Sequence, residues 1–406
     1  MATKDRTILH CDLNCFFASV ELLSHPELMQ IPMAVCGDPN ERHGIILAKN
    51  EPAKKLGIQT AETIWQAKKK CPGLVLLPPH HDLYRKYSRY INQIYGQYTD
   101  LVEPFGIDES WLDITGSMHL FGGDGQTVAD QIRHRIRQEL GLTISVGVSF
   151  NKVFAKLGSD YKKPDATTVI SRENWQDIVW PLPVGDLLYV GHSAQQILHK
   201  YGIDTIGQLA GCQREMLETL MGKMGGQLYD YANGLEHSPV RPQHESEPVK
   251  SVGNGTTFPH NLTRWEEVRT GLSVLCDSVA SRLRQYGLYC GGLSLTIRRA
   301  DFKQHSRQMQ FTTPTHLMKD LYAAALHLAQ EAWHAPDPIR ALTVTALYLS
   351  PESQSYQQLD LLSDSVQKKD DRAEKLESAM DAIRSKYGKN AIAFGTRQKK
   401  MSGWDD

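Results

Sequence analysis

The order of strand-like and helix-like segments in the first 150 residues most constrains the fold of this chain. Residues 7–13 (TILHCDL) form an apolar stretch typical of a short buried strand, and a helix-like segment follows directly. Residues 101–115 resemble two strands joined by a turn, and residues 142–150 alternate as another strand after a helix-like stretch. This order predicts an α+β sheet with helices on one face. Residues 45–75 add short helical pieces.

Length and composition set wide limits on the class of protein. A chain of 406 residues has room for about two to four domains. Hydrophobic residues make up 41% and charged residues 22% of the sequence, a balance typical of folded rather than disordered proteins. The formal net charge of −1 excludes a uniformly basic nucleic-acid binder, although a local basic face is compatible with it.

Cysteine usage and the N-terminal sequence indicate the compartment. The seven cysteines include no CxxC pair, which favours a reducing cytoplasm over a zinc ribbon or a secreted disulfide scaffold. Asp5 and Asp12 interrupt the N-terminal segment, so the apolar core of a signal peptide cannot form there. No apolar run approaches the roughly 18 residues of a membrane span. We therefore expect a cytoplasmic protein that has no membrane partner.

A change in composition divides the chain further along. Residues 181–232 are helical and punctuated by glycine, and a polar, proline-containing linker follows at 234–250. Residues 252–350 then alternate strand-like and helix-like stretches, as expected of a small separate α+β domain. A charged helix is expected at 370–387.

Three carboxylates form the first candidate site. Asp12 ends the first predicted strand, and Asp108 and Glu109 lie at the turn between two others. If these strands are neighbours, the carboxylates converge, and their repulsion requires nearby cations. Oxygen ligands without histidine or cysteine suit Mg²⁺, and two such ions can activate an attacking oxygen and neutralise a leaving pyrophosphate. The alternative is that these acids are ordinary solvated surface residues.

A phosphate-binding site is expected beside these acids. The chain turns into a helix directly after Asp12, so the free N–H groups at Cys15, Phe16 and Phe17 can bind an anion. Phe16 is expected to pack in the core, and Phe17 less so. Lysines elsewhere can assist as triphosphate partners, although a single lysine is more often a solvated side chain; the two candidates are Lys54 and Lys163.

Three motifs carry a resemblance to a known family. DLNCFFASVE, GIDESWLD and NKVFAKLGSDYKKP resemble, in order and spacing, the Y-family translesion DNA polymerases of the bacterial DNA polymerase IV type. The resemblance runs from about residue 7 to about residue 350. It implies an α+β multidomain fold shaped like a right hand. The implied parts are a palm (1–20 and 76–166), small fingers (21–75), a helical thumb with a helix-hairpin-helix (167–233), a linker (234–250), an α+β little finger (251–350) and a C-terminal tail (351–406).

The resemblance assigns roles to residues around the three acids. Asp12 and Asp108 are implied to be metal-bridging carboxylates, with the Leu13 carbonyl as a backbone ligand. Glu109 is implied to be the third acid, near the metal that activates the primer 3′-hydroxyl. Phe17 occupies the position of the family's steric gate, a ring that leaves no room for a ribose 2′-hydroxyl.

The triphosphate residues match the family only in part. Lys163 matches the family's triphosphate lysine. The family segment ANYxAR, whose Tyr and Arg touch the triphosphate, reads KNEPAK here, which places Glu51 and Lys54 at those positions. Lysine keeps the charge but loses the bidentate geometry of arginine. A carboxylate facing a triphosphate is unfavourable, so we expect Glu51 to point away and to cap the helix that starts at Pro52.

Several segments are implied to hold DNA and a partner protein. The segment around Gly191 resembles the helix-hairpin-helix that contacts primer phosphates, although Tyr189 replaces one of its glycines and an ordinary helical hairpin is the alternative. Residues 250–320 contain ten Lys and Arg against five acids, a local basic patch. Its candidate DNA-binding residues are Arg298, Arg299, Lys303 and Arg307. The peptide SYQQLDLL resembles a sliding-clamp motif, through Gln358, Leu359, Leu361 and Leu362.

The implied activity is template-directed DNA synthesis. Such an enzyme adds dNTPs to the 3′ end of a primer with two Mg²⁺ ions, at low fidelity, in DNA damage tolerance. No separate exonuclease domain is apparent in the sequence, so proofreading is not expected, and nothing requires more than a monomer. The alternatives are a palm-type nucleotidyl cyclase and a catalytically weak scaffold that binds DNA and the clamp.

Overall fold

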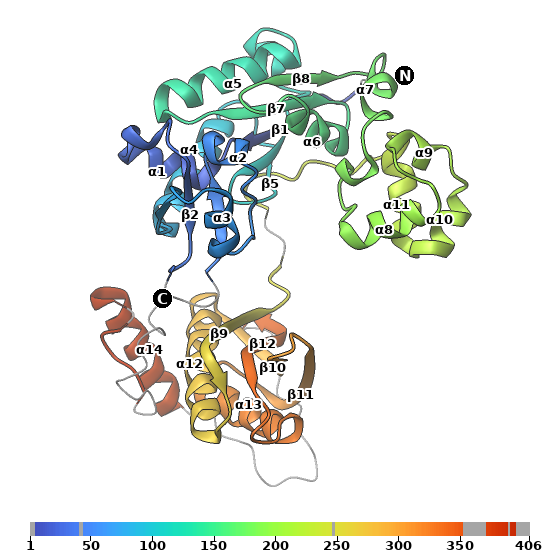
Figure 1. The fold of residues 1–406 in the computed structure, drawn as a ribbon. Helices are drawn as coiled ribbons and strands as arrows, with labels where there is room; N and C mark the ends of the chain where they lie inside the picture. The colour runs from blue at the N-terminus through green and yellow to red at the C-terminus, as the bar shows by residue number, and fades with distance from the viewer. Residues whose placement is uncertain (1–4, 40–43, 246–247, 352–370, 389, 395–406) are drawn as a thin grey trace. The chain divides into compact units, whose positions relative to one another are not determined.

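The computed structural model describes residues 5–39, 44–245, 248–351, 371–388 and 390–394 (Figure 1). The chain divides into two compact units, whose described residues we call unit 1 (residues 5–39 and 44–245) and unit 2 (within residues 248–394). Their boundary falls in the segment predicted as a linker. Among the described ranges, none of the helices has the length and apolar character needed to cross a membrane.

The described part of unit 1 contains a five-stranded sheet. Its strands are β1 (Ile8–Leu13), β5 (Val102–Pro104), β6 (Glu109–Asp113), β7 (Ile144–Ser149) and β8 (Thr167–Ile170). The strand order is β5-β6-β1-β7-β8, and all neighbours are antiparallel except β7 and β8. The strands predicted at 7–13, 101–115 and 142–150 are therefore confirmed, and they are neighbours in one sheet.

Helices cover both faces of this sheet. They are α4 (His81–Tyr95), the 3-10 helix η2 (Met118–Phe121), α5 (Gly125–Leu140) and α6 (Lys152–Tyr161). Successive residues of a strand point to opposite faces. In β1, Leu9 and Cys11 pack in the core with α4 and α5, whereas Ile8 packs beside Ala155 of α6. The prediction of helices on one face is therefore wrong, because β1 is buried on both sides.

A three-stranded sheet occupies residues 33–77 of unit 1. The elements around it are α1 (Phe16–Ser24), η1 (Pro26–Leu28), β2 (Met33–Cys36), β3 (Ile46–Lys49), α2 (Glu51–Lys55), α3 (Ile64–Lys70) and β4 (Val75–Leu77). Strand β2 is central, antiparallel to β3 and parallel to β4. The short helices predicted here are confirmed as α2 and α3. The sequence analysis did not predict these strands, because each has only three or four residues.

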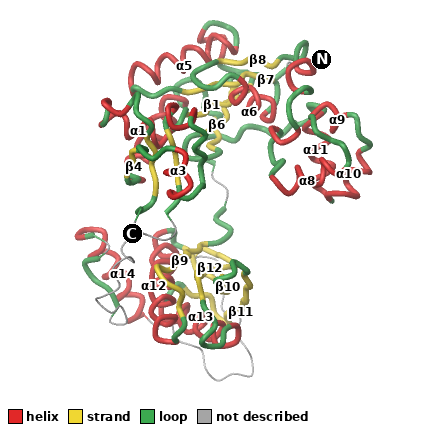
Figure 2. Tube along the Cα trace, viewed as in Figure 1, coloured by secondary structure: helices red, strands yellow, loops and turns green. Residues whose placement is uncertain are grey.

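Residues 175–232 form a cluster of helices (Figure 2). These are α7 (Trp175–Val179), η3 (Val184–Asp186), α8 (His192–Lys200), α9 (Ile206–Ala210), α10 (Arg214–Met221) and α11 (Lys223–Ala232). Leu198, Ile206, Leu217 and Leu228 are fully buried in a core that these helices share. The helical character predicted for residues 181–232 is confirmed.

Unit 2 contains a four-stranded antiparallel sheet with the order β11-β10-β12-β9. Its elements are β9 (Val252–Leu262), α12 (Trp265–Gln285), β10 (Leu288–Arg299), β11 (Gln304–Thr315), α13 (Met318–Ala332), β12 (Ile339–Pro351) and α14 (Asp371–Tyr387). Helices α12 and α13 pack on the sheet through one core, and α14 contacts α12. The predicted alternation at 252–350 and the helix at 370–387 are confirmed.

Candidate active site

The three predicted carboxylates lie at one end of the five-stranded sheet, and we call them the carboxylate cluster (Asp12, Asp108 and Glu109). Asp12 of β1 is directly opposite Glu109 of β6 in the antiparallel register. Asp108 precedes Glu109 in the turn, and its carbonyl oxygen accepts a hydrogen bond from the Leu13 N–H at 3.1 Å. All four residues line one pocket. The structure therefore brings together the residues that were predicted to bind metal.

Helix α6 and the residues after it supply cations to the carboxylate cluster. Lys163 Nζ lies 2.6 Å from Asp12 Oδ2, and Lys156 Nζ lies 3.0 Å from Glu109 Oε2. Asp160 contacts both lysines, at 2.6 Å from Lys163 and 3.7 Å from Lys156. The sequence analysis identified Lys163 but missed Lys156 and Asp160. Their spacing of four residues, which places them on one face of α6, was the available signal.

Burial and charge set the pKa values of the cluster. Burial raises the pKa of Asp12 to about 7, although Lys163 opposes this shift. Burial and the adjacent Glu109 raise the pKa of Asp108. Burial also acts against ionisation of Glu109, but His10 and Lys156 outweigh it and lower the pKa of this carboxyl. Glu109 is therefore the most strongly ionised member of the cluster.

His10 lies beneath Glu109 on the same face of β1 as Asp12. The imidazole is completely buried, and burial lowers its pKa. Its Nδ1 is 2.8 Å from Ser159 Oγ on α6, and its Nε2 is 3.5 Å from Glu109 Oε2. The ring therefore fills the space between the two strands and α6 directly below the cluster. The sequence analysis missed His10, which is two residues before Asp12 and so shares its face.

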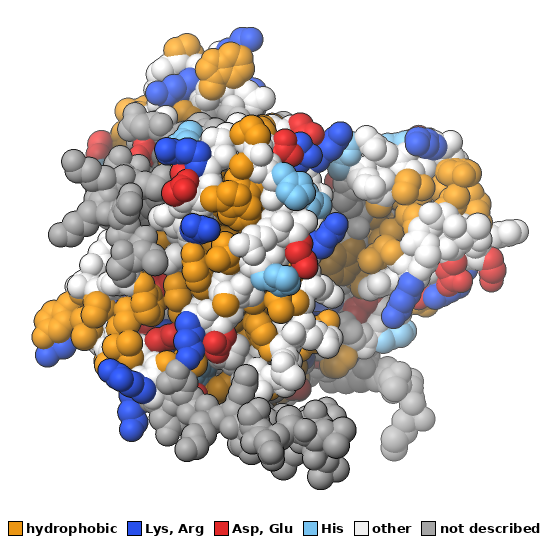
Figure 3. Space-filling model, turned by 90° about the horizontal axis from the view of Figure 1, so that it is seen from below, with side chains coloured by type: hydrophobic (Ala, Val, Ile, Leu, Met, Phe, Trp, Pro, Cys, Tyr) orange, Lys and Arg blue, Asp and Glu red, His pale blue; other side chains and the backbone are white. Residues whose placement is uncertain are grey.

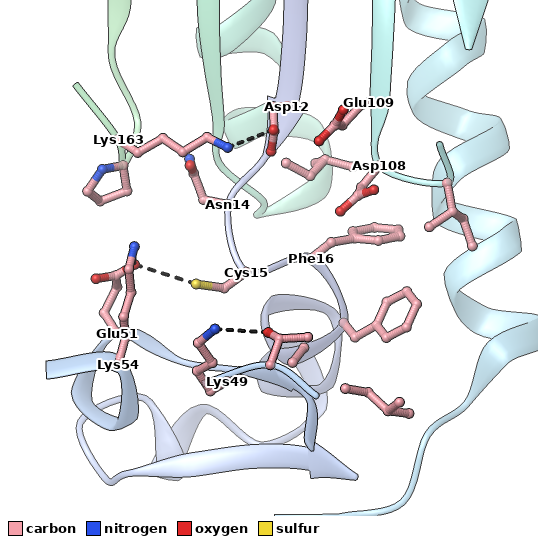
Figure 4. A pocket seen from close by; sticks show the side chains of 17 residues that line it. Asp12, Asn14, Cys15, Phe16, Lys49, Glu51, Lys54, Asp108, Glu109 and Lys163 are labelled. Carbon is pink, nitrogen blue, oxygen red and sulfur yellow. Dashed lines mark hydrogen bonds and ion pairs between the residues drawn. The ribbon is translucent and has the colours of Figure 1, made fainter. Parts of the chain in front are cut away.

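The pocket has a volume of about 420 Å³ and extends from the cluster toward α1 and α2 (Figure 4). Helix α1 begins at Phe16, and Cys15 before it has the left-handed backbone φ of 51°. The first N–H groups of a helix have no intrahelical partner, so they can face an anion. Cys15, Phe16 and Phe17 all line the pocket, as do Lys54 and Lys163. The predicted nucleotide-binding residues are thus gathered around one space.

Phe17 is held in place by aromatic neighbours. Its ring stacks on Tyr84 of α4 with the centroids 4.1 Å apart, and the ring of His81 meets it edge-on. Tyr84 is buried, and its hydroxyl donates to the carboxylate of Glu21, which is also buried. Phe16 is buried in the core as predicted, whereas Phe17 is partly exposed. The ring proposed as a gate is therefore fixed in one orientation.

Glu51 does not lie where the sequence analysis placed it. Asn50 caps helix α2, because its Oδ1 accepts a hydrogen bond from the Ala53 N–H at 3.1 Å. Glu51 lines the pocket instead, and its Oε1 accepts a hydrogen bond from Cys15 Sγ at 3.5 Å. Lys54 Nζ is 3.6 Å from the same oxygen. The expectation that Glu51 points away and caps α2 is wrong.

The predicted DNA-holding residues are exposed, and those of unit 2 do not all lie on one face of its sheet. Gly191 is the residue before α8, and Tyr189, in place of a glycine, has a left-handed φ of 69°. In unit 2 the register places Arg298 opposite Gln304 and Arg307 opposite Leu295. On one strand, residues that are an odd number of positions apart point to opposite faces of the sheet, as Arg298 and Leu295 of β10 do. Arg298 and Arg307 are thus on opposite faces of the β10–β11 hairpin.

The remaining DNA-binding candidates lie in the same hairpin. Arg299 ends β10 and is paired with Asp337 at 3.0 Å, and Lys303 precedes β11. On the face drawn in Figure 3, lysine and arginine side chains lie scattered among hydrophobic and acidic ones. The clamp-peptide candidates, Gln358, Leu359, Leu361 and Leu362, lie outside the described residues.

Comparisons with known proteins agree over nearly the whole chain. Residues 11–160 match the impB/mucB/samB family, and residues 249–361 match the C-terminal domain of that family. The DNA polymerase IV of Acetivibrio thermocellus is 45% identical over 390 residues, which cover 96% of this chain and 97% of that protein. The DNA polymerase IV 1 of Bacillus subtilis is 38% identical over 400 residues, which cover 98% of this chain and 95% of that protein.

A solved structure has the same fold. A Y-family DNA polymerase chimera superimposes with a TM-score of 0.76 and 23% identity, over 85% of this chain and 99% of the chimera. The class of protein is thus a Y-family polymerase fold with a carboxylate cluster at the end of its central sheet. The chain belongs to the impB/mucB/samB family and, within it, to the group of bacterial DNA polymerase IV proteins.

Proposed function

We propose that this protein extends the 3′ end of a DNA primer by adding the deoxynucleotide that a template strand selects. One observation carries the proposal: the carboxylate cluster, Lys163 and Phe17 line a single pocket of about 420 Å³. Its relatives are named DNA polymerase IV, which supports synthesis past damaged template bases. We further propose that copying is of low fidelity and without proofreading.

The donor set of the pocket fits divalent metal ions. Among the described residues, no three His, Cys, Asp or Glu side chains are arranged as a complete metal site, and Lys163 and Lys156 neutralise Asp12 and Glu109 instead. Carboxylate and carbonyl oxygens are the ligands that Mg²⁺ takes in proteins. We assign Asp12, Asp108, Glu109 and the Leu13 carbonyl as the ligands of two Mg²⁺ ions. When bound, such ions activate a primer hydroxyl and stabilise the pyrophosphate that leaves.

The protein's own groups position the nucleotide. The N–H groups at the start of α1 would face the triphosphate, and Lys163, which pairs with Asp12 at 2.6 Å, would be the side chain that binds the phosphates. Asp160 also contacts Lys163 at 2.6 Å and so keeps the ammonium in the pocket. Phe17, stacked on Tyr84, closes the space that a ribose 2′-hydroxyl requires.

DNA and a sliding clamp are the proposed macromolecular partners. We assign the segment at Gly191 to primer-strand phosphates, and the β10–β11 hairpin with Arg298, Arg299, Lys303 and Arg307 to the duplex backbone. Backbone contacts of this kind position a duplex without reading its sequence. The clamp peptide stays a prediction from the sequence.

Primer extension tests the proposal. Purified protein is given Mg²⁺, a primer-template and each dNTP, beside Asp108→Asn and the exposed control Asp177→Asn. We expect template-directed extension that falls at least about 10³-fold in Asp108→Asn, because a metal ligand contributes several kcal/mol, and that is unchanged in the control. Extension that is absent from the wild type, with primer-template binding intact, would favour the scaffold. A cyclic product formed from nucleotide alone would favour the cyclase.

A further inference from the structure

Glu51 places a negative charge inside the pocket that is proposed to receive a triphosphate. It lines that pocket with the carboxylate cluster and with three lysines, Lys49, Lys54 and Lys163. Its side chain lies beside Cys15 and Lys54 rather than with the carboxylate cluster (Figure 4). An additional acid among cations that are suited to phosphates needs a physical explanation.

Two contacts hold the Glu51 carboxylate. Cys15 Sγ donates to Oε1 at 3.5 Å, and Lys54 Nζ lies 3.6 Å from that same oxygen. Cys15 immediately precedes α1, so Glu51 is anchored at the helix start that is proposed to face the phosphates.

The consequence concerns Lys54. An ammonium that is paired with a carboxylate attracts a phosphate less, because the approaching phosphate meets both charges. We propose that Glu51 keeps Lys54 neutralised and thereby weakens binding of the incoming nucleoside triphosphate. This inference rests on the proposed function, since it names the residue that sets the nucleotide affinity of the same pocket. Lys163 and the N–H groups at the start of α1 then supply most of the attraction for the phosphates.

A double-mutant cycle tests the pairing. Glu51→Gln keeps an oxygen that accepts from Cys15 but removes the charge, so the geometry is preserved. Because the pair is partly exposed, we expect KM for the dNTP to fall about two- to five-fold with kcat unchanged. Lys54→Gln should raise KM less than about two-fold in the wild type. In the Glu51→Gln background the same substitution should raise KM by about two- to five-fold. Lys55→Gln, an exposed lysine on the same helix, is the matched control.

Two results would overturn the inference. One is an equal effect of Lys54→Gln in both backgrounds, which would mean that Lys54 reaches the phosphates regardless of Glu51. The other is a KM that is unchanged or raised in Glu51→Gln.

The Kd of each variant for dATP, measured by isothermal titration calorimetry, gives the same ratios without turnover. If primer extension fails, the proposed function is rejected, whereas the Kd values for dATP still test the effect of Glu51 on nucleotide binding.

Discussion

Asp108 differs from the other two carboxylates of the cluster in having no ion pair among the described residues, whereas Asp12 and Glu109 each face a lysine. Burial and Glu109 raise its pKa above the ordinary value of 3.8. A carboxyl with a raised pKa in the folded state stabilises the protein fully at low pH and loses this contribution as pH rises through that pKa. Ionised Asp108 therefore destabilises the metal-free protein at neutral pH.

Replacing Asp108 by asparagine should consequently stabilise the metal-free protein. We expect a higher Tm for Asp108→Asn than for the wild type in EDTA at pH 8, and a difference that shrinks as the pH is lowered toward 4. Adding Mg²⁺ should raise the Tm of the wild type more than that of the variant. Thermal unfolding followed by circular dichroism between pH 4 and pH 8 measures both effects. A difference in Tm that does not depend on pH would contradict this reasoning.

Phe17 supplies the second prediction at the scale of a residue. The ring is fixed by its stack on Tyr84, so removing it opens the pocket at a defined place. Phe17→Ala should raise the kcat/KM for ribonucleotides relative to deoxynucleotides by about ten-fold or more, which corresponds to about 1.4 kcal/mol. Steady-state kinetics with rNTP and dNTP measure the ratio. Trp65→Ala, a 70% exposed aromatic residue on α3 outside the pocket lining, is the control; equal ratios in the two variants would reject the gate.

At the scale of elements, α14 is attached to α12 by buried ion pairs. Arg284 of α12 contacts the carboxylates of Glu377 and Asp381, and Glu377 also accepts from the Met318 N–H at 3.0 Å. Arg284 and Glu377 are each less than a tenth exposed. A buried carboxylate without its partner is costly, so Arg284 is one of two arginines that hold α14; the other is Arg384 of α14, which pairs with Asp277 of α12 at 2.8 Å.

Removing that arginine should loosen α14. Arg284→Met leaves Glu377 without its cation and Asp381 with only Arg384, at 3.8 Å, and we expect unit 2 to lose about 3 kcal/mol of stability. Hydrogen exchange measured by mass spectrometry should show faster exchange in α12 and α14. The control is Arg264→Met. Because the Arg264 side chain in the pair with Glu267 is exposed, this variant should lose less than about 1 kcal/mol of stability. Equal protection of α14 in both variants would show that the ion pairs of Arg284 do not hold the helix.

The elements also show what the sequence could predict of the fold. Strands β1 and β7 and helix α5 have clear apolar patterns, and their positions follow from the residues alone. The strands β2, β3 and β4 do not, because three or four residues are too few to establish a period. The continuous apolar run of β1 is itself typical of a strand covered on both faces, since a strand covered on one face alternates, so the expectation of helices on one face did not use this signal.

For the site too, the sequence predicted the residues that are marked by their position along the chain and missed those whose placement depends on tertiary contacts. The cluster acids and Lys163 were found because they follow strand ends and a recognisable motif. Glu51 was misplaced because its orientation depends on Cys15, a contact across 36 residues of sequence. Lys156 and Asp160 lie on one face of α6, but only the packing of α6 on β1 shows that this face meets carboxylates.

At the scale of the whole molecule, charge is distributed unevenly in a chain whose formal net charge is −1. Residues 250–320 contain ten Lys and Arg and five Asp and Glu, a net charge of +5. The chain thus combines a nearly neutral total with a basic segment in unit 2. Such an arrangement supports phosphate contacts at one segment without the general attraction of a uniformly basic protein.

The salt dependence of DNA binding tests whether this segment contacts phosphates. Each lost Lys or Arg contact with a phosphate lowers the slope of log affinity against log salt by about 0.9. Arg299 is already paired with Asp337, so the double variant Arg298→Gln with Arg299→Gln should flatten the slope by about 1 to 2. Fluorescence anisotropy with a labelled primer-template between low and moderate salt measures it, and Lys375→Gln on α14 is the control. Weaker binding with an unchanged slope would mean that the arginines support the hairpin rather than touch phosphates.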